Sequence, residues 1–271
     1  NVMKVCAIQL NTIPYDKEAN LKKAASFIEE ALDKGAEIIA LPELFNTGYC
    51  CYEKEYELSE ELCGQTSSFL LKYAEKYGVC FIAGFIEKSN IPGLVYDSVM
   101  FVSKDAAVDS YIKIYLWQEE NTSFLKGNSL KRWFHGSAVI APQICYEAGF
   151  PENAKINALK GANLLVNCAA FNQKRLDIWD IETRSRAIET GSFVIAANHS
   201  ETEHDKFNLN YCAHSRIIDP KGKILCEASL SDEAIIADID LNLCVEQRRF
   251  LPYLRDIDPA FTAKEFSSIQ K

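Results

Sequence analysis

Apolar runs of strand length alternate with longer amphipathic segments along most of the sequence, and this alternation limits the fold more than any other feature. Residues 4–10 have the pattern of a strand and residues 17–34 that of a helix, with Asp16 placed to cap its start and Gly35 to end it. The run EIIALP, residues 37–42, has the continuous apolar character of a buried parallel strand. Strands and helices in this order favour βαβ units.

The same alternation predicts the rest of the chain. The expected elements are a helix over 67–78, strands over 79–86, 94–103 and 107–116, a strand ending at Cys145, a helix over 152–160, a strand over 163–168, a helix over 175–190, a strand over 192–198, and two strands joined by the turn DPKG at 219–222. No linker rich in Pro, Gly or Ser separates the two halves. We therefore expect one α/β domain that spans residues 1–271.

Two segments of this pattern align without gaps. KGAEIIALPELF, residues 34–45, and KGANLLVNCAAF, residues 160–171, each read as a helix end, a buried strand and a loop. Any βαβ crossover produces such a pattern, so we favour that interpretation over an internal duplication. Either interpretation gives βαβ units on two sheets.

Charge and cysteine usage narrow the classes of function. A formal charge of −9 and a pI near 5.1 disfavour binding to nucleic acid or to anionic membranes, because both require clustered Lys and Arg. The first residues lack a basic leader and a long apolar stretch, so we expect a cytoplasmic protein. Its ten cysteines include no CxxC pair and should be mostly reduced there. The four histidines show no metal-binding spacing, so we expect neither a metal nor another cofactor.

Three chemically active side chains stand where predicted strands end or are interrupted. Glu43 follows EIIALP, Lys113 interrupts the apolar run YIKIYLW, and Cys145 ends the run APQIC before YEAGFPE turns the chain. Each residue alone has an ordinary explanation: a solvated carboxylate, a surface lysine and a small buried residue. In open α/β sheets, however, functional groups gather at the carboxyl ends of strands. We therefore expect these three side chains to meet.

Together, these groups have the chemistry of nucleophilic catalysis. A thiol with an ordinary pKa near 8.5 needs a base at neutral pH, and the carboxylate of Glu43 is a candidate. Attack on a carbonyl or nitrile carbon develops negative charge, which the Lys113 ammonium and the backbone N–H of Tyr146 could stabilise. The pattern predicts a cysteine nucleophile held at a strand-to-helix turn.

Four segments resemble one known family over nearly the whole chain. LPELFNTGY, YIKIYLWQEENTSFLKG, ICYEAGFPE and RSRAIETGSFVIAAN are similar to motifs of the nitrilase, or carbon-nitrogen hydrolase, superfamily. The resemblance implies a four-layer αββα sandwich and a triad of Glu43 as general base, Lys113 as charge stabiliser and Cys145 as nucleophile. It also implies a second glutamate near the site, for which Glu120 fits better than Glu119.

Some positions depart from the family pattern. Tyr115 stands where many members have histidine, alanines replace glycines at 138, 141 and 213, and the segment NCAAFNQ, residues 167–173, lacks a proline that many relatives carry. None of these differences removes a member of the triad. They leave the shape of the substrate pocket open.

The reaction class implied by the resemblance is hydrolysis of a non-peptide C–N bond in a small amide, N-carbamoyl compound or nitrile, through a thioester on Cys145. The alternatives are acyl transfer to an amine, and a redox-responsive binding protein in which Cys145 is a sensor thiol. The resemblance also implies a homodimer or a higher even oligomer. The C-terminal stretch 246–271 mixes aromatic and charged residues, as would an arm that crosses to a partner. A tail folded back on its own subunit is the alternative.

Overall fold

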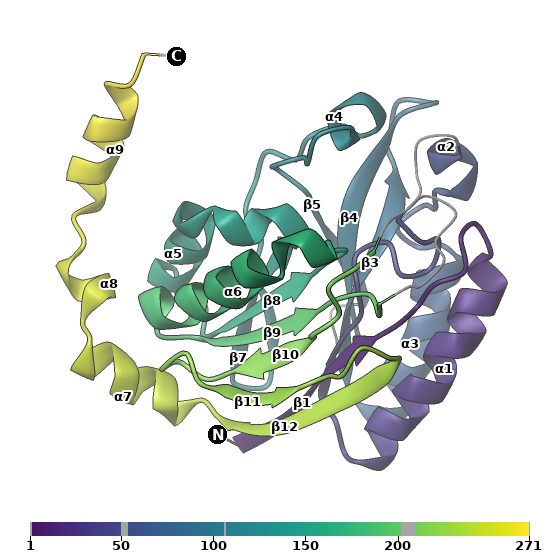
Figure 1. The fold of residues 1–271 in the computed structure, drawn as a ribbon, viewed down its shortest axis with the longest axis horizontal. Coiled ribbons are helices and arrows are strands. Elements are labelled where there is room, and N and C mark those ends of the chain that lie inside the picture. Colours follow the sequence, from purple (N-terminus) through teal and green to yellow (C-terminus); the bar gives the residue numbers. More distant parts are fainter. Residues whose placement is uncertain (1, 50–53, 106, 202–209, 271) are drawn as a thin grey trace.

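The computed structural model describes residues 2–49, 54–105, 107–201 and 210–270. Its strands form two six-stranded sheets that lie face to face, and helices cover the outer face of each sheet (Figure 1). The expected αββα sandwich is therefore confirmed. One apolar cluster fills the space between the sheets and a second lies between the first sheet and its helices.

The first sheet contains the N-terminal half of the chain and one late strand. Its order is β12-β1-β2-β3-β4-β5, with β1 Val2–Gln9, β2 Ile38–Ala40, β3 Cys80–Lys88, β4 Val95–Ser103, β5 Ala107–Ile112 and β12 Glu233–Asp240. The strands β1, β2 and β3 are parallel neighbours, and the other pairs are antiparallel. The sequence analysis did not predict β12, which pairs along the whole of β1 and closes that edge.

The second sheet has the order β11-β10-β9-β8-β7-β6. Its strands are β6 Trp133–His135, β7 Ala138–Ile144, β8 Leu164–Cys168, β9 Phe193–Ala197, β10 Arg216–Ile218 and β11 Ile224–Glu227. When the edge strands β12 and β6 are set aside, the remaining strands of each sheet lie in chain order. In both sheets the first three of them are parallel neighbours. The aligned segments 34–45 and 160–171 contain β2 and β8, which occupy equivalent places in the two sheets.

Four long helices form the outer layers. They are α1 Lys17–Asp33 and α3 Gln65–Tyr77 on the first sheet, and α5 Pro151–Leu159 and α6 Leu176–Thr190 on the second. The predicted cap is confirmed, because the Asp16 side chain accepts a hydrogen bond from the backbone N–H of Ala19 at 3.0 Å. Gly78 follows α3 with φ +70°, a conformation that glycine adopts without strain.

The remaining helices belong to loops and to the C-terminal region. They are α2 Glu55–Leu58, α4 Glu120–Ser123, the 3₁₀ turns η1 Cys145–Gly149 and η2 Gln173–Arg175, and the final helices α7 Asn242–Phe250, α8 Tyr253–Asp256 and α9 Pro259–Ser267. In Figure 1 the last three run along one side of the molecule, and α9 extends beyond the sheets. No helix in the described ranges is long and apolar enough to cross a membrane.

One predicted boundary is wrong in a way that bears on the site. The strand expected over 107–116 ends at Ile112, and the Lys113 backbone then leaves the ladder of β5. The Lys113 N–H still donates to the Asp97 carbonyl at 2.9 Å, and its carbonyl accepts from Gly127 at 2.8 Å. The apolar residues after Ile112 pack around the site and do not extend the sheet. They are as hydrophobic as a buried strand, and for this reason the strand was predicted to continue to residue 116.

Candidate active site

Cys145 lies at a sharp turn directly after β7. Its backbone φ is +46°, a left-handed conformation that costs energy for any residue except glycine and is found where surrounding structure enforces it. The Asn167 side-chain N–H of neighbouring β8 donates to the Cys145 carbonyl at 3.3 Å. The turn points the thiol out of the sheet, which explains why a cysteine stands where the strand ends.

The Glu147 carboxylate connects this turn to the segment that carries Lys113. It accepts hydrogen bonds from the backbone N–H of Ile144 at 2.9 Å and of Ile114 at 2.7 Å, and from the Tyr111 hydroxyl at 2.9 Å. Burial raises the pKa of Glu147 to about 7, although these hydrogen bonds oppose the shift. One buried side chain thus fixes the residues that precede Cys145 and follow Lys113.

Glu43 follows β2 and is fully buried. Its Oε1 accepts from Lys113 Nζ at 2.5 Å, and its Oε2 accepts from the Ala170 backbone N–H at 3.0 Å. Burial opposes ionisation, but the Lys113 ammonium and the hydrogen bonds outweigh it, so the pKa of Glu43 lies below its usual value. Glu43 is therefore an ionised carboxylate, and it lies close enough to the Cys145 thiol for its charge to act on it.

Two features outside the motifs hold the backbone of Glu43. The His199 ring contacts the Glu43 carbonyl through Nε2 at 2.6 Å. Gly84 of β3 lies beneath the loop, and a Cβ at that position would come within 2.6 Å of the Glu43 Cα. Only glycine permits this close approach.

Lys113 is enclosed by carboxylates. Its Nζ lies 2.5 Å from Glu43, 2.9 Å from Glu120 and 3.3 Å from Asp97, and all four side chains are 0% exposed. Burial disfavours the ammonium, but the three carboxylates outweigh it and raise the pKa of Lys113 well above its usual value. The lysine is therefore a fixed positive charge.

Glu120 begins α4 and lies against Lys113, where the short loop from the strand was expected to place it. Its carboxylate also accepts hydrogen bonds from the Tyr49 hydroxyl and, at 2.8 Å, from the Trp117 backbone N–H. Glu119, the alternative, is exposed. The geometry therefore favours Glu120 over Glu119 as the second glutamate near Lys113.

Glu120→Gln is expected to lower kcat by about 10²-fold, because it deletes a positioned charge beside Lys113 while it keeps the side-chain shape. The measurement is steady-state ammonia release from an amide substrate at neutral pH. Glu119→Gln is the matched control and should retain the activity of the unaltered protein. Normal turnover of both variants would remove Glu120 from the site.

Glu43, Asp97 and Glu120 are close enough together to hold a metal ion by distance alone. The Lys113 Nζ, however, is in contact with a carboxylate oxygen of each of them. This ammonium lies among the three carboxylates, where a bound cation would otherwise lie. Metal-independent catalysis stays a prediction, for which activity unchanged by a chelator is the expected result.

The Cys145 thiol is 4% exposed and uncharged at rest. Burial is the main cause that raises its pKa well above the usual value, and the Glu43 charge adds to it, while Lys113 and Arg175 act in the opposite direction. The thiol therefore has to lose its proton to a base as it reacts. Glu43 is the carboxylate whose charge acts most strongly on it.

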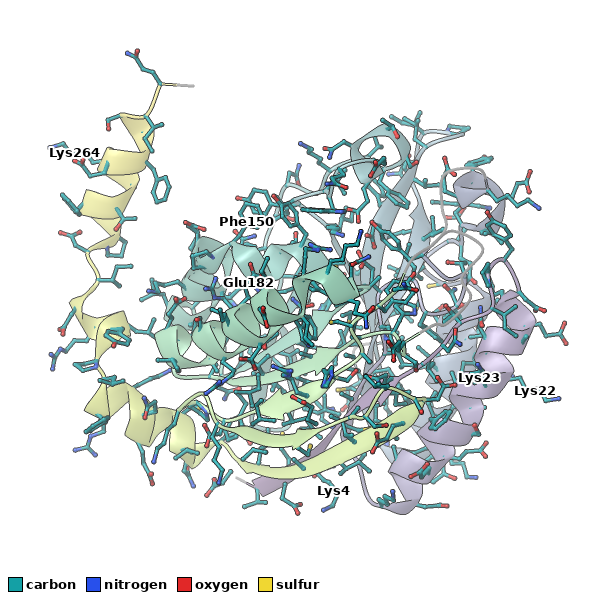
Figure 2. The ribbon with its side chains drawn as sticks, in the orientation of Figure 1. Lys4, Lys22, Lys23, Phe150, Glu182 and Lys264 are labelled. Carbon is teal, nitrogen blue, oxygen red and sulfur yellow. The ribbon has the colours of Figure 1, made fainter. Side chains whose placement is uncertain are left out.

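Aromatic side chains surround the exit from the turn. Tyr146, the second residue of η1, packs edge-on against Trp117 and Phe150, with ring centroids 4.8 and 5.1 Å apart. Its backbone N–H lies in the first turn of η1, where N–H groups have no acceptor within the helix. Phe150, labelled in Figure 2, stacks on Tyr115 with the ring centroids 3.7 Å apart.

Arg175, at the end of η2, brings a positive charge to the same region. Its guanidinium lies 4.2 Å from the centroid of the Trp117 ring and 4.3 Å from that of Phe171, and its charge acts on the Cys145 thiol. Stacking on two rings holds a guanidinium while its N–H groups stay available. Arg175 is half-buried, so a substrate anion can reach it.

Sequence reasoning did not identify Asp97, Glu147, Arg175 or His199 as parts of the site. Asp97 had the clearest signal, because it is a charged residue within an apolar strand, on the face that also carries Val99 and Phe101. The sequence gives no spacing rule for Arg175 or His199, since their contacts come from other strands. Cys50 and Cys51 lie outside the described residues.

Comparison with known proteins agrees with this geometry. The family model for the carbon-nitrogen hydrolases matches residues 4–249. The chain is 34% identical over 249 residues to 2-oxoglutaramate amidase of Bacillus subtilis, which covers 90% of this chain and 94% of the relative. It is 30% identical over 259 residues to omega-amidase NIT2 of Homo sapiens, with 92% and 91% covered.

Solved structures give the same result. A carbon-nitrogen hydrolase from Helicobacter pylori G27 superposes with a TM-score of 0.89 at 25% identity, covering 97% of each chain. Nit3 of Saccharomyces cerevisiae, a member of branch 10 of the nitrilase superfamily, superposes with a TM-score of 0.86 at 27% identity, covering 93% of this chain and 94% of the other. Sequence, fold and site geometry agree, and the chain belongs to the carbon-nitrogen hydrolase family.

Proposed function

We propose that this protein is an amidase whose substrate is a small amide that also carries a carboxylate. The observation that carries the proposal is Arg175, a half-buried guanidinium stacked between Trp117 and Phe171 with its charge directed at the Cys145 region. A guanidinium in this setting pairs well with a carboxylate. It would anchor the far end of a short substrate while the amide faces the thiol.

The first half of the reaction uses Glu43 and Cys145. The sulfur attacks the amide carbon as its proton passes to Glu43, and the carbonyl electrons move to oxygen. Lys113 and the Tyr146 N–H stabilise that oxyanion. The intermediate collapses, the C–N bond breaks, and protonated Glu43 gives its proton to the departing nitrogen, which leaves ammonia and a thioester.

The second half returns the enzyme to its starting state. Water attacks the thioester carbon as Glu43 takes one of its protons. The C–S bond then breaks, and the proton on Glu43 returns to the sulfur. The product is a carboxylic acid. Glu120 holds Lys113 in its charged form and in place throughout.

The relatives support this substrate class. One is named 2-oxoglutaramate amidase and another omega-amidase. The compound in the first name carries an amide and a carboxylate at opposite ends. Other relatives are named nitrilase, so nitriles belong in the substrate test.

The test compares ammonia release from succinamate and from butyramide, which match in carbon number but differ in the carboxylate. Succinamate should have the higher kcat/KM. Arg175→Gln should lower kcat/KM for succinamate by about tenfold or more, mainly through KM, and leave butyramide nearly unchanged. An equal response of both substrates would contradict the carboxylate-binding role. Ammonia release from nitriles but not from amides would contradict amidase activity.

Two alternatives from the sequence have less support. Acyl transfer to an amine would appear as an amide product when an amine is added to the reaction. A sensor thiol needs a low pKa and exposure to oxidant. Cys145 has a raised pKa and is buried, which favours catalysis assisted by a base.

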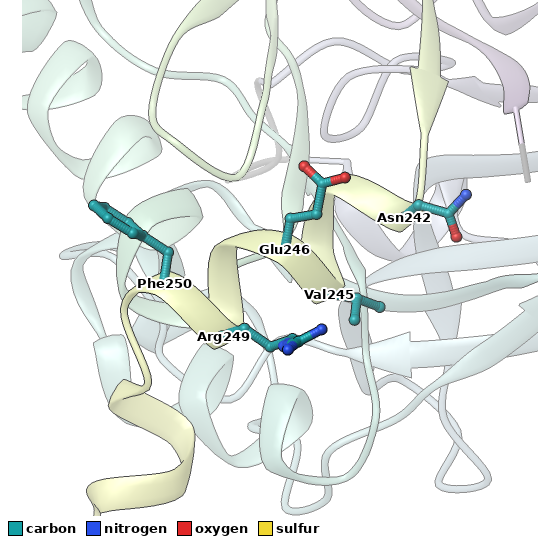
Figure 3. A pocket seen from close by; sticks show the side chains of 5 residues that line it. All are labelled: Asn242, Val245, Glu246, Arg249 and Phe250. Carbon is teal, nitrogen blue, oxygen red and sulfur yellow. The ribbon is translucent and has the colours of Figure 1, made fainter.

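We further propose that residues 1–271 form one hydrolase domain in which 246–271 is an arm that contacts a second copy of the chain. The arm carries exposed apolar side chains, among them Phe250, Phe261 and Phe266. A cavity of about 530 Å³ separates α9 from α5, with Ile156 and Phe266 in its lining. Figure 3 shows a second hollow on α7, lined by Asn242, Val245, Glu246, Arg249 and Phe250. A second copy of the chain bound to the arm would cover both the cavity and the hollow.

Light scattering at micromolar concentration is expected to give at least twice the 30.5 kDa mass of one chain. The double variant Phe261→Asp/Phe266→Asp should shift the mass towards a single chain, because two charges would enter the buried contact. Ile13→Asp changes another exposed apolar residue, outside the arm, and is the control. A monomer in every sample would reject the arm as an interface.

A cytoplasmic location also belongs to this proposal. All cysteines in the described residues are free thiols, of which Cys63 is exposed and Cys6, Cys80 and Cys168 are buried. Free thiols persist in a reducing compartment.

A further inference from the structure

Three carboxylates and one ammonium are buried together at the centre of the site. Glu43, Asp97, Glu120 and Lys113 are each 0% exposed. If all four were ionised, two negative charges would remain uncompensated away from water. Burial of uncompensated charge costs several kcal/mol per group, so such clusters retain a proton. The question is which carboxylate holds it.

The three buried carboxylates differ in the hydrogen-bond donors that surround them. Glu43 accepts from Lys113 and from the Ala170 N–H, and Glu120 accepts from Lys113, the Tyr49 hydroxyl and the Trp117 N–H. These donors stabilise an ionised carboxylate, although burial, with the Glu43 charge, still raises the pKa of Glu120 above its usual value.

Asp97 lacks that support. Its Oδ2 accepts one bond, from Lys113 at the longer distance of 3.3 Å, and no donor among the described residues reaches its Oδ1. Carboxylate oxygens of Asp97 and Glu43 nevertheless lie within 4.8 Å of each other, and both side chains are fully buried. Two carboxyl groups this close can share a hydrogen bond only when one of them is protonated.

We propose that Asp97 is held as a neutral carboxylic acid that donates its proton to the Glu43 carboxylate, and that it is a positioning residue for the base. Its place on β4, on the face that carries Val99 and Phe101, points it between the sheets, within 4.8 Å of the Glu43 carboxylate. The bond keeps Glu43 ionised and fixes its rotamer, while Glu43 remains close to Cys145. This inference rests on the base role proposed for Glu43.

The charged groups around Asp97 agree with this assignment. Glu43, Glu120 and the Lys113 ammonium face it, and the Cys168 thiol of β8 lies near enough to interact with it. Burial is the main cause that raises the pKa of Asp97 well above its usual value. Lys113 acts against that shift, and the two glutamates add to it.

Infrared difference spectroscopy tests the protonation state without any substrate. Spectra of the unaltered protein and of Asp97→Asn are compared at about pH 9, where Glu147, with a pKa of about 7, is ionised. The carbonyl band of a protonated carboxylic acid should be present in the unaltered protein and lost in Asp97→Asn. It should persist in Glu120→Gln. Absence of the band, or its loss only in Glu120→Gln, would overturn the proposal.

The pH profile of kcat/KM tests the effect on the base. Asp97→Asn keeps a donor towards Glu43, so the acid limb of its profile should match that of the unaltered protein. Asp97→Ala removes the donor, and its acid limb should move to higher pH by about one unit or more. Equal shifts in both variants, or no shift in either, would overturn the positioning role.

The infrared measurement and the activity measurement test different claims, so a negative result in one does not decide the other. The infrared comparison uses the unaltered protein, Asp97→Asn and Glu120→Gln, so it gives a result even where Asp97→Ala does not fold. An acid band at Asp97 in a protein that releases no ammonia from amides would contradict the proposed function and leave the proton assignment standing.

Discussion

Replacement of Cys145 by Ala is expected to lower turnover by about 10⁴-fold or more, which makes it the largest effect of any single substitution in this protein. The thiol is the atom that attacks, and no other nucleophile can form the thioester in its place. The fold should survive, because Ala is small and Cys145 lies at a turn whose backbone is held by neighbouring residues. The measurement is ammonia release, with thermal unfolding recorded in parallel.

Cysteine controls make this result specific. Cys63→Ala changes an exposed thiol and Cys168→Ala a buried one, and both variants should retain substantial activity. Mass spectrometry of the unaltered protein incubated with an amide should detect an acyl adduct on Cys145. Substantial turnover by Cys145→Ala would contradict the mechanism at its first step.

Glu43→Gln is expected to lower turnover by about 10³-fold, in the range of a lost general base, because the amide cannot accept the proton of a thiol whose pKa is raised. In the proposed mechanism Glu43 is the base in both thioester formation and thioester hydrolysis, so both should slow. The measurement is the pH profile of kcat/KM. In the unaltered protein the lowered pKa of Glu43 should place the acid limb below the usual glutamate value.

Glu18→Gln is the control for Glu43→Gln, since it removes one carboxylate from an exposed position on α1. It should behave like the unaltered protein. Glu43→Gln also leaves Lys113 with one ionised partner fewer, so its stability has to be measured beside its activity. If a stable Glu43→Gln protein kept normal turnover, another group would have to be the base.

Local sequence pattern was sufficient for most of the fold. Apolar runs predicted β2, β8 and the parallel cores, and Asp16 and Gly78 marked a helix start and a helix end, because capping and strand burial act over a few residues. The edge strand β12 was missed, since it pairs with a strand more than two hundred residues earlier. Lys113 was assigned to a strand because the residues after it are as apolar as a strand.

From the sequence, Glu43, Lys113 and Cys145 could be predicted as candidate site residues, because each stands at or next to a strand end with side-chain chemistry suited to one reaction. Their charge states, in contrast, depend on the tertiary structure. Burial raises the pKa of the thiol, the Lys113 ammonium lowers that of Glu43, and three carboxylates from different strands and loops surround that ammonium. Such effects depend on distance and on exclusion of water between residues far apart in the chain, and no local pattern of residues encodes them.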